Sequence, residues 1–168
     1  MEILIWKIRE LLLSTWFTPS PEVHTAGAII LRLGCAVLLA GLLGLERERQ
    51  GRSAGLRTHI LVCLGATLAM IISEFLAREW LLANPSAFLD KSRMATGILT
   101  GIGFLGAGAI INEGSIHRGL TTAAMIWFVA ALGIAIGLGL YLLATIATAF
   151  PLGVVICLRF VANHFPAH

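Results

Sequence analysis

A long uncharged run in the second half of this sequence limits the structures open to it. No Asp, Glu, Lys or Arg occurs between Gly119 and Leu158. A helix that crosses a bilayer needs about 20 mostly apolar residues, so the run is long enough for two such helices in succession. Gly137, Gly139 and Tyr141 mark a tight turn within it. The run therefore predicts membrane-spanning helices at 119–137 and 139–158.

The composition of the whole chain also indicates a membrane protein. Of its 168 residues, 58% are hydrophobic and 12% are charged. Soluble domains contain about 25% charged residues, and a small soluble protein needs them to cover its surface. We therefore exclude a soluble globular enzyme, a disordered tail and a nucleic-acid-binding module. The net charge of +3 is typical of a membrane protein whose cytoplasmic loops carry Arg and Lys.

Three further runs have the length and composition of membrane spans. They lie at 24–45, where Arg32 is the one firm charge, at 58–77 and at 94–112. The expected fold is an all-α polytopic membrane helix bundle with about five transmembrane helices. Residues 24–158 form this predicted transmembrane domain, and residues 159–168 form a short cytoplasmic tail.

The N-terminal segment differs from these spans because Lys7, Arg9 and Glu10 interrupt it. Its two tryptophans, Trp6 and Trp16, are placed to meet lipid headgroups. Residues 1–20 are therefore predicted to form an amphipathic helix that lies on the membrane surface. The alternative is a helix packed against the bundle.

A dense group of arginines follows the first span, at Arg47, Arg49, Arg52 and Arg57. Basic residues gather in cytoplasmic loops, so this loop is predicted to be cytoplasmic. With five spans, the N-terminus then lies on the outer side of the membrane and the C-terminus lies in the cytoplasm. The basic residues of the 78–93 loop, which this topology places outside, weaken the argument.

Charged side chains at membrane depth need partners, because burying one costs about 3 kcal/mol or more. Arg32 in the first span and Glu74 in the second lie at comparable depth, because the two spans run in opposite directions. Two interpretations are open. The side chains pair near the outer leaflet, or each extends separately to the interface.

A second polar group is expected at the cytoplasmic ends of the spans. Glu46 and Arg49 are three residues apart, a spacing that allows a pair on one helical face. The group is either a solvated helix end or a cytoplasm-facing pocket completed by the other spans. The full candidate polar cluster comprises Arg32, Glu46, Arg47, Arg57, Glu74, Arg93, Asn112, Glu113 and Thr121.

The residue pattern of a catalytic or cofactor site is missing from the sequence. Ser53, Ser73 and Ser92 have no His or Asp companion at motif spacing. The three cysteines lie far apart in apolar runs, and His59 and His117 have no metal-ligand spacing. We therefore expect no enzymatic activity, no cofactor and no metal site.

Glycines concentrate in the 94–112 span and recur in the 119–137 span. Gly101, Gly103 and Gly106 match the dinucleotide-binding GxGxxG pattern, but that motif needs a preceding strand and a soluble helix. Glycine faces let membrane helices pack closely, and a glycine-rich helix can also unwind to line a cavity. Both interpretations are open for the 94–112 span. The predicted packing glycines are Gly97, Gly101, Gly103, Gly106, Gly108, Gly133 and Gly137.

Three blocks of the sequence together resemble the MgtC/SapB family of bacterial membrane proteins. They are RLGCAVLLAGLLGLERERQGRSAGLRTHILVCLGA, SRMATGILTGIGFLGAGAII and GLTTAAMIWFVAALGIAIGLGLY, in the family's order. Matching positions are Arg32, the pair Glu46 and Arg47, the GLRT step from Gly55 to Thr58, Arg93, the glycine core from Gly101 to Gly108, the GLTTA step from Gly119 to Ala123, and Trp127. Longer members carry a soluble cytoplasmic ACT-like domain. This sequence ends at His168, so we expect a short SapB-like member.

The resemblance implies an inner-membrane protein without enzymatic chemistry, associated with growth at low magnesium and, in pathogens, with survival inside macrophages. It implies action by binding other membrane proteins, including the ATP synthase. We therefore expect the lipid bilayer and a membrane protein as partners, with a homodimer as a further option and no nucleic acid. The alternative is a transporter or channel for Mg²⁺ or another small ion. The arginines close to Glu46 oppose a cation there.

Overall fold

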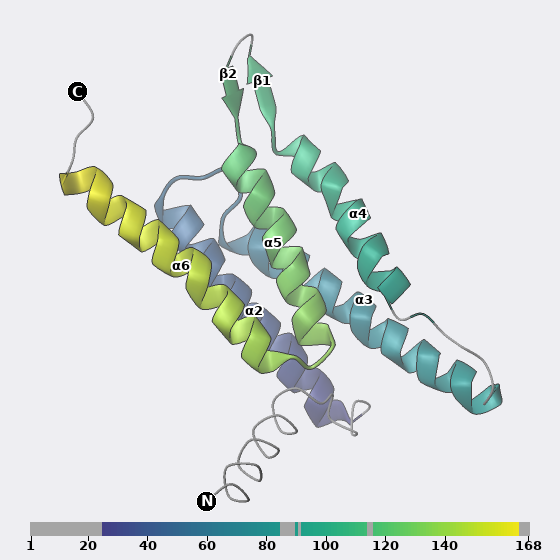
Figure 1. Cartoon of the computed structure of the whole chain (residues 1–168). Helices are drawn as coiled ribbons and strands as arrows, with labels where there is room; N and C mark the ends of the chain where they lie inside the picture. Colours follow the sequence, from purple (N-terminus) through teal and green to yellow (C-terminus); the bar gives the residue numbers. More distant parts are fainter. Residues whose placement is uncertain (1–24, 85–89, 91, 114–115, 165–168) are drawn as a thin grey trace, which may run out of the picture.

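The computed structural model describes residues 25–84, 90, 92–113 and 116–164, with side chains except at 111–117 and 155–164. This part of the chain forms five helices and a two-stranded hairpin (Figure 1). The elements are α2 (Ala26–Arg49), α3 (Leu56–Ala83), α4 (Ser92–Gly108), β1 (Ile111–Glu113), β2 (Ile116–Arg118), α5 (Leu120–Gly137) and α6 (Tyr141–His164). The predicted surface helix at residues 1–20 lies outside the described residues.

Each of the five predicted spans coincides with one helix, so the predicted helical fold is confirmed. The helices continue beyond the uncharged runs. For example, α2 runs on through Arg47 and Arg49 in its last turn. Positive side chains at a helix C-terminus interact favourably with the negative end of the helix dipole, which explains this extension. The turn between the last two helices contains Gly139 at φ +78°, as the glycines there predict.

The predicted end of the third span is wrong. Helix α4 ends at Gly108, and residues 111–118 turn back as an antiparallel hairpin in which Ile111 faces Arg118. Gly119 joins the hairpin to α5 with φ +90°, and a Cβ there would overlap the carbonyl of Ala109. Only glycine fits this close approach. The end of α4 therefore depends on backbone geometry that hydropathy does not record.

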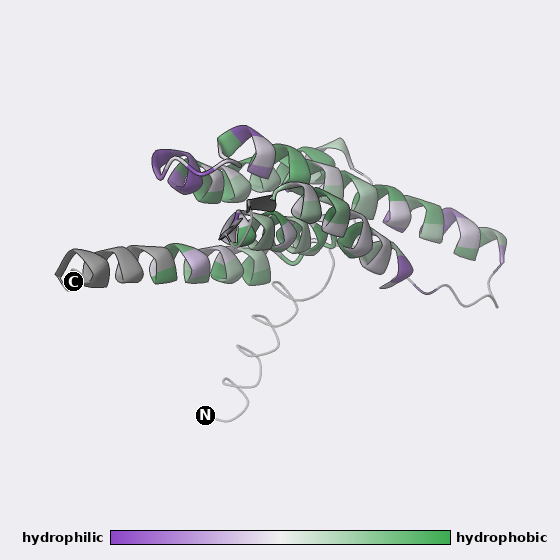
Figure 2. Ribbon diagram, turned by 90° about the horizontal axis from the view of Figure 1, so that it is seen from above, coloured by the Kyte–Doolittle hydropathy of each residue, from purple (hydrophilic) through white to green (hydrophobic). Residues whose placement is uncertain are grey.

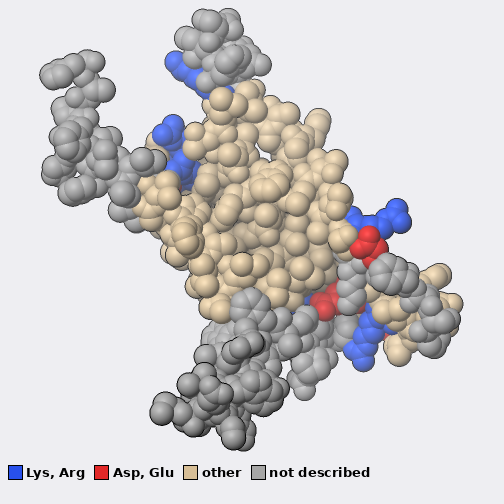
Figure 3. All heavy atoms as spheres, in the orientation of Figure 1, with Lys and Arg blue, Asp and Glu red and all other residues tan. Residues whose placement is uncertain are grey.

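Three of the helices are long and apolar enough to cross a membrane: α2, α3 and α5. A shorter apolar helix segment runs from Tyr141 to Val154 in α6, and α4 has 17 residues. Hydrophobic residues cover the middle of the helices (Figure 2). On the face shown in Figure 3, charged side chains lie near the ends of the molecule, with an uncharged band between them. This distribution is the one that a membrane-embedded bundle requires.

Helices α2, α3 and α5 form the centre of the bundle, and α6 packs against α2 and α5. The core between them consists mainly of small and branched apolar side chains, namely Ala36, Ala40, Leu43, Cys63, Val129, Leu132, Ile136 and Ala144. Helix α4 lies at the edge, where it packs chiefly on α5 and touches α3 more sparsely. The seam between α3 and α4 is therefore packed more sparsely than the seam between α4 and α5.

Candidate functional site

A buried ion pair joins three helices near one end of the bundle. Arg32 of α2 is 0% exposed, and its Nη1 lies 2.8 Å from Oε2 of Glu74 on α3. The same Nη1 donates a 2.6 Å hydrogen bond to the carbonyl of Gly137, the last residue of α5. The predicted pairing of Arg32 with Glu74 is therefore confirmed, and the interpretation in which each side chain extends separately to the interface is wrong. The carbonyl partner was not predicted, because a backbone acceptor has no sequence signature.

One edge of the Arg32 guanidinium remains open. Its Nε and Nη2 are buried and have no hydrogen-bond partner among the described residues. These two atoms lie along one edge of the planar guanidinium, and their N–H groups match the two oxygens of a carboxylate or phosphate. A Cβ at Gly139 would lie 3.5 Å from Nη2, so the glycine leaves space beside this edge. Arg32 is thus neutralised by Glu74 but retains two unused donors.

At the other end of the bundle, Glu46 pairs with Arg47 and not with Arg49, the partner that the sequence spacing allowed. Its Oε2 lies 2.7 Å from Nε of Arg47, its neighbour in sequence, and its Oε1 accepts a hydrogen bond from Gln50. Arg47 is only 3% exposed, so the backbone turns it inward although it sits in a charged stretch. The carboxylate of Glu48 accepts the backbone N–H of Leu56 at 2.8 Å and so caps the start of α3.

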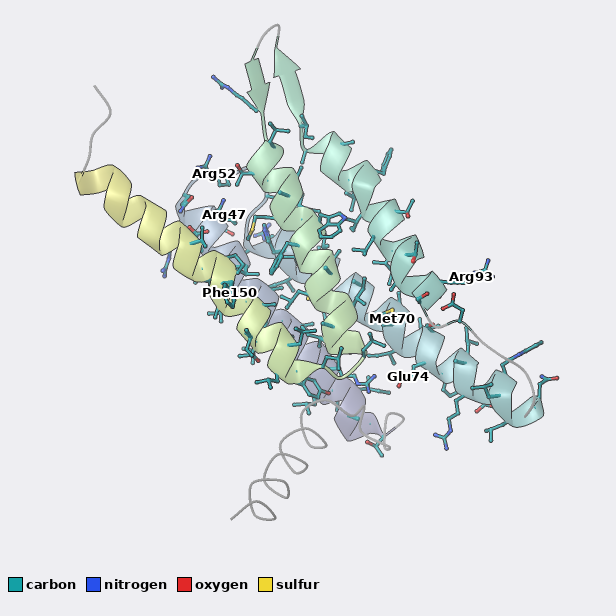
Figure 4. The ribbon with its side chains drawn as sticks, in the orientation of Figure 1. Arg47, Arg52, Met70, Glu74, Arg93 and Phe150 are labelled. Atoms are coloured by element: carbon teal, nitrogen blue, oxygen red, sulfur yellow. The ribbon has the colours of Figure 1, made fainter. Side chains whose placement is uncertain are left out.

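The predicted cytoplasmic pocket is not assembled by the described side chains. Arg57 and Thr121 are exposed, and the side chains of Asn112 and Glu113 lie outside the described residues. Figure 4 places Arg93 and Glu74 toward the α3–α4 connection and Arg47 at the opposite end. The candidate residues therefore divide into two separate groups, one at each end of the bundle.

His59 is a polar residue whose complete burial the sequence did not indicate. Its side chain is 0% exposed, its Nδ1 lies 2.8 Å from the carbonyl of Gly55, and its Nε2 has no partner among the described residues. The close approach of α2 encloses it, because a Cβ at Gly44 would lie 3.0 Å from Cβ of His59. Among the described residues, no group of three or more His, Cys, Asp or Glu is placed to hold a metal ion.

The glycines behave differently in α5 and in α4. A Cβ at Gly133 would lie 2.5 Å from the carbonyl oxygen of Cys63, and one at Gly137 would lie 2.5 Å from Cβ of Met70. These two glycines let α5 approach α3 closely. By contrast, a Cβ added to α4 would meet nothing within 4 Å at Gly97, Gly101, Gly103 or Gly108, and only Ala123 at 3.9 Å from Gly106. Among the described residues the α4 glycines therefore bring no helix into such close approach, and α4 is a continuous helix from Ser92 to Gly108.

An apolar groove of about 440 Å³ lies along the sparse seam between α3 and α4. Gly97 and Gly101 of α4 line it opposite Gly65 of α3, together with larger apolar side chains such as Leu61 and Leu105. Two of the glycines that meet no neighbouring side chain, Gly97 and Gly101, thus form part of one wall of an open groove.

The elements above define a multi-pass membrane protein with glycine-mediated helix packing and an internal ion pair. The chain belongs to the MgtC family, whose model matches residues 33–164. It is 45% identical over 112 residues to the protein named putative magnesium transporter YhiD of Escherichia coli K12, covering 67% of this chain and 52% of that one.

Two proteins named MgtC are similarly close. The chain is 42% identical to that of Brucella abortus (strain 2308) over 139 residues, covering 83% of this chain and 53% of the relative. It is 42% identical to that of Salmonella typhimurium over 130 residues, covering 77% and 52%. The chain thus spans about half the length of the curated relatives it matches. No solved structure matches it.

Proposed function

We propose that this chain is a non-enzymatic regulator in the bacterial inner membrane that binds other membrane proteins and supports growth at low magnesium. The observation that carries the proposal is the uncovered glycine face of α4, where Gly97 and Gly101 line an open groove. Membrane helices associate through small residues that let backbones approach, so such a face suits a partner helix. The name of the Escherichia coli relative, putative magnesium transporter YhiD, agrees with a magnesium-related role.

The charges inside the bundle support binding over ion transport. Arg32 is neutralised by Glu74, and the inward-turned Arg47 is neutralised by Glu46. Mg²⁺ prefers carboxylates and keeps several of its waters, so an arginine in direct contact with each carboxylate disfavours a magnesium site.

The topology that we propose for this regulator has five membrane spans, with the N-terminus outside and the C-terminus in the cytoplasm. Arg47, Arg49, Arg52 and Arg57 flank the α2–α3 connection, and Arg118 ends the hairpin at the same end of the bundle. Basic residues favour the cytoplasmic side of a membrane. Helix α4, at 17 residues, is at the short limit for a span of about 30 Å.

A magnesium transporter is the second candidate function, favoured by the name of the Escherichia coli relative. It requires that the Arg32–Glu74 or Glu46–Arg47 pair opens during transport, since both carboxylates are occupied. The two candidates therefore differ in whether purified protein moves Mg²⁺ by itself.

The test uses a bacterium that lacks its own MgtC-family proteins and expresses this chain. Gly101→Leu fills the groove, and Gly34→Leu makes the same change at an exposed glycine of α2 with open space around it. We expect Gly101→Leu alone to lose growth at low magnesium and co-purification with the membrane sector of the ATP synthase, the partner that the family suggests. Saturable Mg²⁺ flux into proteoliposomes, abolished by Glu46→Gln, would instead establish the transporter.

A further inference from the structure

A second cavity, of about 620 Å³, lies where α3 and α4 approach their connection. Its floor is apolar and is built from Leu76 and Ala77 of α3 and Met94 of α4. Its rim carries Trp80, which is 53% exposed, at the position where α3 nears the end of its apolar stretch. An apolar floor under a tryptophan is the arrangement found where a membrane protein meets the boundary between acyl chains and headgroups.

The same rim holds charges of both signs. Arg93, in the first turn of α4, lines the cavity together with Glu79 and Asp90. Figure 4 shows Arg93 at this end of α4. The hydroxyl and the backbone N–H of Ser92 donate to Oδ1 of Asp90 at 2.7 and 2.9 Å, and these hydrogen bonds lower the pKa of Asp90. These hydrogen bonds therefore favour the ionised carboxylate. One cation and two anions beside an apolar floor match a molecule with a phosphate, an ammonium and a long tail.

The charge balance selects among phospholipid headgroups. An anionic phosphoglycerol group would bring a net negative charge to a rim with two carboxylates and one arginine. A choline group has no N–H to donate to a carboxylate, whereas an ethanolamine ammonium has three. An arginine can hold the phosphate through charge-assisted hydrogen bonds, and the N-terminal end of α4 adds a favourable dipole.

We propose that this cavity binds a phospholipid with an ethanolamine headgroup, its phosphate on Arg93, its ammonium on Glu79 and Asp90, and its acyl chain over Leu76 and Met94. The site is separate from the glycine-lined groove, which has other lining residues, so it does not depend on the proposed function.

The experiment is native mass spectrometry of the full chain, delipidated in detergent and then mixed with equal amounts of phosphatidylethanolamine, phosphatidylcholine and phosphatidylglycerol. We expect one phosphatidylethanolamine to remain bound in clear excess over the other two lipids. Arg93→Gln should weaken its retention about tenfold, the size expected for a lost charge-assisted hydrogen bond. Arg78→Gln is the matched control. Arg78 is an exposed arginine in the part of α3 beside the cavity, but it does not line the cavity.

A second variant tests the assignment of the ammonium. Glu79→Gln combined with Asp90→Asn keeps the polar shape of the rim but removes both negative charges, so the preference should move toward phosphatidylglycerol. Equal retention of the three lipids by the unsubstituted chain would overturn the proposal, as would equal losses in Arg93→Gln and Arg78→Gln. A lipid-free dimer in place of a lipid-bound monomer would show that a second copy covers the cavity, and would overturn it too.

Discussion

At the scale of single residues, Arg32 does more than neutralise one carboxylate. Its Nη1 binds both Glu74 and the carbonyl of Gly137, so one side chain connects α2, α3 and the C-terminus of α5. A positive charge at a helix C-terminus is favourable, and the terminal carbonyls of a helix lack partners within the helix. Two nitrogens of the same guanidinium have no partner among the described residues, so a bound water or oxyanion that accepted from them would add stability.

The ion pair predicts a specific pattern of stability. Glu74→Leu leaves Arg32 buried without its counter-charge, so we expect the free energy of unfolding to fall by about 3–5 kcal/mol. Adding Arg32→Met should recover most of that loss, because two apolar side chains then replace two buried charges. Reversible unfolding by SDS in mixed micelles measures both values.

Arg78→Gln serves as the control for this series, since Arg78 is an exposed charged residue of the same helix. Its effect should stay within about 0.5 kcal/mol. If the double variant is less stable than Glu74→Leu, the bond from Arg32 to Gly137, rather than the ion pair, dominates at this site.

At the scale of helices, glycine has two different roles in this chain. In α5 the glycines are contact points, because Cβ atoms at Gly133 and Gly137 would clash with α3. In α4 they are open, and the helix leaves a groove beside α3. The difference follows from how each helix is rotated about its axis and how closely it approaches its neighbour, which the GxxxG spacing alone does not specify.

Alanine substitutions separate the two roles. Gly133→Ala and Gly137→Ala force α5 and α3 apart, so each should lower the free energy of unfolding by about 1–3 kcal/mol. Gly101→Ala places its methyl group in open space and should have an effect near zero, or a slight gain from helix propensity. Thermal unfolding in detergent compares the three variants, and equal losses in all of them would contradict the distinction.

At the scale of the whole molecule, the structure divides the connections between two ends. The α2–α3 connection and the hairpin lie at one end of the bundle, and the end of α3, the start of α4 and the α5–α6 turn lie at the other (Figure 1). A bundle placed across a bilayer in this way exposes the two groups to opposite compartments. The arginines near the α2–α3 connection assign that end to the cytoplasm under our proposal.

Labelling with a membrane-impermeant maleimide tests this arrangement in intact cells and in inverted vesicles. Ser53→Cys in the α2–α3 connection and Arg118→Cys in the hairpin should react only in inverted vesicles. Asn84→Cys, at the end of α3, should react only in intact cells. The unsubstituted chain is the control, because its three cysteines, Cys35, Cys63 and Cys157, lie within α2, α3 and α6. Labelling of Ser53→Cys and Asn84→Cys from the same side would contradict the topology.

The sequence by itself determined where the apolar helices lie and which two charges share a depth. Run length alone decides whether a segment suits a bilayer, and Arg32 and Glu74 could be matched by counting residues along antiparallel helices. The end of α4 was missed, because its hairpin depends on the close approach of Gly119 to Ala109.

Packing between helices, in contrast, sets which glycines are in contact, which edge of Arg32 remains open and which charged residues line the α3–α4 cavity. The physical reason is that these features depend on distances between helices far apart in the chain. Hydropathy and spacing describe each helix separately, whereas its rotation and approach are set by the packing of the whole bundle.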